Sequence, residues 1–130
     1  MSIFKMISEN KAKGKVKKIF DEIKEVRKIK KIPNFWRSIA SDPDTLERTW
    51  NSLKQVMKKG ALDQMTKEMI YVAVSMTNSC EYCIRSHSLA AKKRGMSDLM
   101  LKELIAVVAM ANETNRLVES YQVKVDDFLK

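Results

Sequence analysis

Glycine and proline are scarce in this sequence, and long apolar runs are missing. Three glycines and two prolines among 130 residues leave few positions for irregular backbone, because these residue types interrupt helices and mark turns. No run of about 18 uncharged apolar residues occurs, so the sequence predicts no membrane-spanning helix. The first residues also lack the apolar core of a secretory signal. From these absences we predict a cytoplasmic protein.

Cysteine is equally rare, with two in the chain, and there is one histidine. Cys80 and Cys83 are separated by only two residues, and His87 follows one helical turn later. In a cytoplasmic protein a close cysteine pair is seldom a permanent structural bridge and is more often catalytic or metal-binding. The scarcity therefore concentrates the candidate chemistry in one short segment.

The net charge of +9 is unevenly distributed. Residues 1–31 hold 11 of the 25 basic residues and 4 of the 16 acidic ones. A basic stripe can bind nucleic acid or an anionic surface, but a lysine-rich helix face exposed to water is the simpler interpretation. No aromatic residues alternate with the lysines, as a base-stacking platform would need. We therefore expect neither a nucleic acid nor a membrane partner.

Apolar residues recur with a helical period through most of the chain, which predicts an all-α, single-domain bundle of about six helices over residues 1–130. Residues 1–12 are left as a loose N-terminal arm. Pro33, Gly60 and Gly95 mark helix ends, while Asp42, Asp63 and Ser97 are the expected N-caps. The predicted helices span residues 13–31, 34–40, 43–59, 63–77 and 80–94, with the last beginning at 97.

Two segments are expected to supply much of the core. Residues 69–76 are apolar nearly all round, which fits a buried strand or a helix at the centre of a bundle, and the helical neighbours favour the helix. The last helix should turn an apolar side to the core, formed by Leu101, Leu104, Ile105, Val108 and Met110.

Cys80, Cys83 and His87 are spaced i, i+3, i+7, so they share one face of a helix. Amide groups and the dipole at a helix N-terminus favour thiolates, and a thiolate beside a second cysteine can be oxidised to sulfenic acid and resolved as a disulfide. His87 lies where a general base for Cys83 would have to be. A turn at Asn78-Ser79 would bring Glu68 opposite His87, either as a carboxylate that orients the imidazole or as a solvated first-turn acid.

Glu68, eleven intervening residues and Cys80-x-x-Cys83-x-x-x-His87 together resemble the signature of the alkylhydroperoxidase D-like family, within the carboxymuconolactone decarboxylase superfamily. The resemblance covers roughly residues 20–115. Further segments also resemble that family: Ile32-Pro33-Asn34-Phe35, Asp42-Pro43, Leu62 to Glu68, and Gly95-Met96-Ser97.

This resemblance implies an all-α bundle that assembles as a trimer or hexamer and reduces small hydroperoxides without a cofactor. Cys83 would be the attacking thiolate, Cys80 the proton donor and resolving thiol, and His87 with Glu68 the proton relay. A protein dithiol, such as one bearing a lipoyl group, would return the electrons. The helix dipole alone would instead favour Cys80 as the thiolate. Tyr82 replaces a histidine of the best-known members, which removes one proton carrier and leaves a slower thiol oxidoreductase or sensor open.

Other functions are compatible with parts of the pattern. Cys80, Cys83, His87 and Glu68 are acceptable zinc ligands by type, although three ligands on one helix rarely reach a single point. Decarboxylase members of the superfamily, as the resemblance has it, lack the cysteine pair, so the pair in this sequence argues against decarboxylase chemistry. Two inert, buried cysteines in a helical bundle are the remaining interpretation, which a thiol titration would test.

Overall fold

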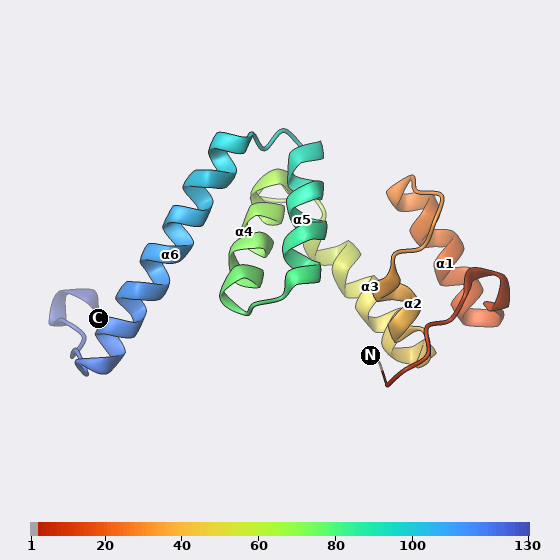
Figure 1. Ribbon diagram of the computed structural model, residues 1–130, viewed down its shortest axis with the longest axis horizontal. Coiled ribbons are helices and arrows are strands. Elements are labelled where there is room, and N and C mark those ends of the chain that lie inside the picture. The colour runs from red at the N-terminus through yellow and green to blue at the C-terminus, as the bar shows by residue number, and fades with distance from the viewer. Residues whose placement is uncertain (1–2) are drawn as a thin grey trace. The chain divides into compact units, whose positions relative to one another are not determined.

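The computed structural model describes residues 3–130. Met1 and Ser2, part of the predicted N-terminal arm, lie outside the described residues. The described chain contains six α-helices, two short 3₁₀ helices and no strand (Figure 1), which confirms the predicted all-α fold. The elements are η1 Glu9–Lys11, α1 Gly14–Arg27, α2 Asn34–Ile39, α3 Pro43–Met57, α4 Gln64–Thr77, α5 Glu81–Lys93, α6 Asp98–Ser120 and η2 Asp127–Leu129.

Two compact units make up the chain, divided between Val56 and Met57. The single domain expected over residues 1–130 stays a prediction. Within residues 3–130, none of the helices combines the length and the hydrophobicity that crossing a bilayer requires.

The first unit is built around a buried apolar cluster. α1 contributes the predicted stripe, and two tryptophans meet edge to face at its centre, with the ring centroids of Trp36 and Trp50 5.4 Å apart. Val26 was expected in the stripe but is 55% exposed, because α1 ends at Arg27 and Lys28 turns into the left-handed region at φ 54°. The members of the cluster are Ala12, Val16, Ile19, Phe20, Ile23, Ile32, Trp36, Ala40, Leu46 and Trp50.

Residues 7–12 do not form the loose arm that the sequence suggested. The Ile7 amide donates to the Arg37 carbonyl at 2.9 Å, and Arg37 Nε donates back to the Ile7 carbonyl at 3.2 Å. Glu9 accepts the Ile32 amide at 2.7 Å and pairs with Lys24. Backbone groups of this segment are therefore satisfied by α2 and by the residues that precede it, an arrangement that local sequence patterns do not reveal.

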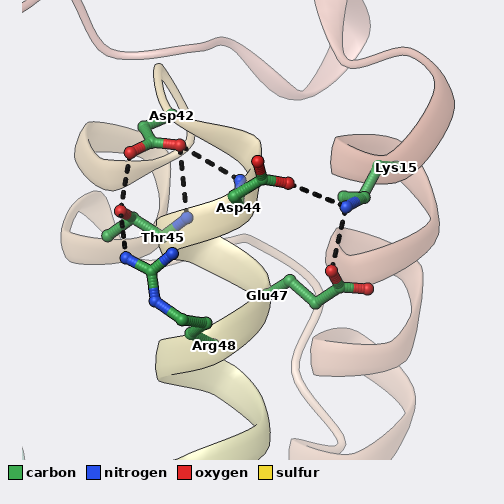
Figure 2. A network of polar contacts seen from close by, with 6 residues as sticks. All are labelled: Lys15, Asp42, Asp44, Thr45, Glu47 and Arg48. Atoms are coloured by element: carbon green, nitrogen blue, oxygen red, sulfur yellow. Dashed lines mark hydrogen bonds and ion pairs between the residues drawn. The ribbon is translucent and has the colours of Figure 1, made fainter.

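α3 begins at a network of polar contacts (Figure 2). As predicted, Asp42 caps the helix, accepting the amides of Asp44 and Thr45 at 3.1 and 3.2 Å and the Thr45 hydroxyl at 2.6 Å. These hydrogen bonds lower the pKa of Asp42. Lys15 of α1 donates to Asp44 and Glu47 at 2.9 Å each, which ties α1 to α3 and neutralises part of the basic charge of residues 1–31.

The second unit is built on an antiparallel hairpin of α4 and α5, which lie side by side in Figure 1. Asp63 caps α4 by accepting the Thr66 amide at 2.7 Å, as expected, and Ser97 caps α6 in the same way. The turn passes through Ser79 in the left-handed region at φ 55°. α6 packs against α4, and the Asn112 amide donates to the Thr77 hydroxyl at 3.1 Å.

The prediction that α4 and α6 supply the core is wrong for much of their surface. Ile70 and Val74 of α4 are 47% and 54% exposed, and no residue of α6 is buried, with Met110 58% exposed. Three helices offer each other only one packed face apiece, so the apolar positions on the other faces stay at the surface of this chain.

The first unit should depend on its fully buried residues. We expect Leu46→Ala to lower the free energy of unfolding by about 2–5 kcal/mol, because it removes buried methyl groups and leaves a cavity. Leu99→Ala is the control, since Leu99 is 71% exposed. Urea titration of both variants would measure the change, and an equal effect of the two substitutions would contradict the assigned core.

Candidate active site

Glu68 and His87 face each other across the α4–α5 hairpin. Their side chains are 10% and 14% exposed, and His87 Nδ1 lies 2.6 Å from Glu68 Oε2. A short contact between an imidazole and a carboxylate favours the tautomer with the proton on Nδ1. Nε2 is then the ring nitrogen that can accept a proton from a thiol. The structure thus brings together the two residues that the sequence paired across the turn.

The two cysteines stand at the start of α5. Cys80 is the N-cap residue, and its Sγ accepts the Cys83 amide at 3.4 Å. Both residues are partly buried and neither is in a disulfide. Because His87 follows Cys83 by four positions in α5, the two side chains fall on the same face of the helix. The geometry therefore groups both thiols with the carboxylate–imidazole pair on one hairpin.

The Cys83 thiol is less acidic than the sequence suggested. Burial, together with the hydrogen bond and the charge of Cys80, raises the pKa of Cys83 to about 11, while a hydrogen bond with Ser75 acts in the opposite direction. The expectation that the helix N-terminus favours the thiolate is thus wrong for Cys83. Its own amide is engaged with the Cys80 sulfur, and burial, the largest cause of the raised pKa, disfavours the charged form.

Tyr71 and Ser75 are site residues that the sequence reasoning missed. The Tyr71 ring stacks on the His87 imidazole, with centroids 3.6 Å apart and an interplanar angle of 19°. Ser75 is 4% exposed, and its hydroxyl donates to the Tyr71 carbonyl at 2.7 Å besides contacting Cys83. The available signal was the spacing, since positions 68, 71 and 75 repeat the i, i+3, i+7 pattern of positions 80, 83 and 87.

Tyr82, which stands where the resemblance implies a histidine, is 45% exposed. Among residues 3–130, no group of three or more His, Cys, Asp and Glu side chains is arranged to hold a metal ion. The zinc alternative therefore has no geometric support in the described part of the chain. The residues instead suit proton transfer between an imidazole and a partly buried thiol.

A helical hairpin that pairs a buried Glu–His couple with Cys-x-x-Cys defines an all-α protein of the alkylhydroperoxidase D-like fold. The sequence model of the carboxymuconolactone decarboxylase family matches residues 43–124, and the chain belongs to that family. The structure is similar to the crystal structure of the alkylhydroperoxidase AhpD core from Rhodospirillum rubrum, with 41% identity and a TM-score of 0.95, covering 100% of this chain and 98% of that one.

A curated relative is the uncharacterized protein 4 in the cox locus of Paracoccus denitrificans. It is 39% identical over 56 residues, which are 43% of this chain and 50% of the relative. The matched segment thus spans about half the length of that relative. These comparisons confirm the family resemblance drawn from the sequence, and they leave the roles of the individual site residues as predictions.

The partners of Cys83 should control its ionisation. We expect Cys80→Ser to shift the thiolate titration of Cys83 to lower pH, because the Cys80 charge and hydrogen bond raise the pKa of Cys83. Adding Ser75→Ala should shift it back toward higher pH, since the Ser75 hydroxyl favours the charged form when it turns its proton from the Tyr71 carbonyl to the sulfur. Ultraviolet absorbance of the thiolate would follow both titrations.

The matched control for the Ser75 substitution is Thr77→Ala, which removes another hydroxyl of α4 that donates to a backbone carbonyl, here that of Ala73. This variant should leave the midpoint of the Cys83 titration unchanged. Identical midpoints in the Cys80→Ser protein with and without Ser75→Ala would show that Ser75 does not act on the sulfur.

Proposed function

We propose that the protein is a thiol-dependent, peroxidase-like oxidoreductase that reduces small hydroperoxides through a thiol–disulfide cycle of Cys80 and Cys83. The observation that carries the proposal is the 2.6 Å contact between His87 Nδ1 and Glu68 on a hairpin that also holds both thiols. The 41% identity to the alkylhydroperoxidase AhpD core of Rhodospirillum rubrum supports the same reaction class. No resident cofactor is invoked, since the cysteines themselves exchange the electrons.

In the first step Cys83 acts as the nucleophile. With a pKa of about 11 it is a thiol at neutral pH, so its attack depends on a base. His87 Nε2 takes the thiol proton, and the Glu68 carboxylate stabilises the resulting imidazolium. The Cys83 thiolate then attacks the terminal oxygen of the hydroperoxide. The O–O bond breaks, Cys83 becomes a sulfenic acid, and the departing alkoxide takes a proton from Cys80 to leave as an alcohol.

In the second step Cys80 resolves the sulfenic acid. The Cys80 thiolate attacks Cys83 Sγ, a disulfide forms, and hydroxide leaves as water with the proton that His87 had taken. Cys80 suits this role because the Cys83 amide holds its sulfur at the start of the same helix. A protein dithiol, of the kind a lipoyl group provides, then reduces the disulfide with two electrons and becomes a disulfide itself.

A slower thiol–disulfide oxidoreductase or redox sensor is the second candidate for the same residues. The raised pKa of Cys83 favours it, because little thiolate is present before a base acts. The exposed Tyr82 favours it too, since a histidine at that position would add a proton carrier. The two candidates share the cysteine chemistry and differ in turnover with hydroperoxide.

We also propose that the protein is a homo-oligomer, a trimer or a hexamer. Large apolar side chains are exposed along all three helices of the second unit, including Val74, Leu89 and Val107 at 54%, 57% and 67%. Extended apolar surface of this kind is typical of interfaces between subunits. A second copy of the chain would cover these helices with matching surface.

Peroxide turnover with a dithiol reductant tests the main proposal. We expect Cys83→Ser to abolish it and His87→Ala to reduce it by about two to four orders of magnitude, the usual contribution of a general base. Cys80→Ser should form the Cys83 sulfenic acid once and then stall, which a sulfenic-acid trapping reagent would detect. The turnover of the Glu68→Gln variant should lie between that of the wild type and that of His87→Ala.

Arg85→Ala is the control for these variants, because Arg85 is exposed on α5 and pairs only with Glu81 among the contacts described. It should retain wild-type turnover. Equal rates in the wild type and in all the site variants would refute the assignment. Slow disulfide exchange without peroxide turnover in the wild type would favour the second candidate.

Light scattering tests the oligomer. The wild type should have the mass of three or six chains, and Val107→Glu should shift the population toward smaller species, because burying an unpaired carboxylate in an interface is costly. A monomeric mass for the wild type would contradict the proposed assembly.

A further inference from the structure

Tyr71 makes a contact with the imidazole that the proton relay leaves unexplained. Its ring lies nearly parallel to that of His87, with an interplanar angle of 19° and centroids 3.6 Å apart. Glu68 approaches the same imidazole at its edge, through Nδ1. Two side chains of α4 therefore hold the His87 imidazole. The Glu68 carboxylate contacts its edge, and the Tyr71 ring contacts its face.

These two contacts constrain different motions of the imidazole. A single hydrogen bond at Nδ1 fixes one atom of the ring but lets the plane tilt about the line between Nδ1 and Oε2. A stacked neighbour restricts that tilt, because tilting would separate the two faces or bring them into collision. Since the ring plane sets the direction of Nε2, the stack determines where the basic nitrogen points.

We propose that Tyr71 is a positioning residue that holds the His87 ring plane, so that Nε2 stays directed at the Cys83 thiol. This role deepens the function proposed above and rests on it for the identity of the thiol that gives its proton to Nε2. Tyr71 holds the imidazole plane through the face of its ring and not through its hydroxyl. Glu68 and Tyr71 of α4 contact His87, and Cys83 lies one turn earlier than His87 on α5.

The backbone around Tyr71 supports a defined ring position. The Tyr71 carbonyl accepts the hydroxyl of the buried Ser75 at 2.7 Å, and Val72 next to it is fully buried. The Tyr71 backbone is thus anchored in the hairpin at the level of the cysteine site. A substitution of its side chain changes the stack while these backbone contacts persist.

The single histidine of the chain makes the test direct. In reduced protein with isotope-labelled histidine, the Nδ1 proton shared with Glu68 should give one downfield nuclear magnetic resonance signal protected from exchange with water. Tyr71→Phe keeps the stacked ring and should keep both this signal and wild-type sulfenic acid formation. Tyr71→Leu and Tyr71→Met should broaden or lose the signal and slow the reaction of Cys83 about tenfold, the scale of a stacking contact.

Tyr121→Leu is the matched control, because Tyr121 is 78% exposed on a separate element. It should change neither the signal nor the rate, and the backbone amide spectrum of each variant shows whether the hairpin is intact. The proposal is overturned if the signal is absent in the wild type, if it survives unchanged in both Tyr71→Leu and Tyr71→Met, if Tyr71→Phe loses it, or if the rate does not fall. A wild type that does not react with peroxide would refute the proposed function, while the signal would still decide the role of Tyr71.

Discussion

The burial of Glu68 is the constraint on which the second unit depends. A carboxylate that leaves water loses its hydration, and this loss is tolerated in a protein interior only when a hydrogen-bonded partner replaces the water. His87 is that partner, at 2.6 Å. Sliding α5 along α4 by one turn would separate the two groups, so the contact favours a single register for the hairpin. That register also places Ser75 beside Cys83 and Tyr71 beside His87.

The same packing creates a conflict at Cys83 that the site has to resolve. Turning the sulfur toward the hairpin groups it with a base, but burial raises its pKa to about 11. In the proposed function, a thiol in that environment depends on its neighbours for activation. Under the proposed function, the reactivity of Cys83 depends on the orientation of the His87 imidazole, which Glu68 and Tyr71 of α4 contact. This coupling connects the helix packing to the chemistry.

The two units differ in how they bury apolar surface. The first unit has a contiguous core around Trp36 and Trp50, with its N-terminal segment hydrogen-bonded to α2. The second leaves most apolar residues of α5 and α6 partly or fully exposed, and its fully buried positions are few, Val72 and Ala91 among them. A hairpin with one adjoining helix cannot surround its own apolar side chains. The unit that holds the cysteine pair thus also exposes the larger number of large apolar side chains.

The sequence by itself determined the features that depend on neighbouring residues. Caps such as Asp42, Asp63 and Ser97 act within one turn, and the i, i+4 spacing places Cys83 and His87 on one face wherever the helix lies, with Cys80 at its N-cap. Even the pairing of Glu68 with His87 followed from a short turn. Spacing puts Tyr71 and Ser75 on the same face of α4 as Glu68, but the tertiary structure decided which groups they contact, the attachment of residues 7–12 and the raised pKa of Cys83. Each of these depends on which groups from other segments of the chain contact a residue or exclude water from it, and no local pattern records that.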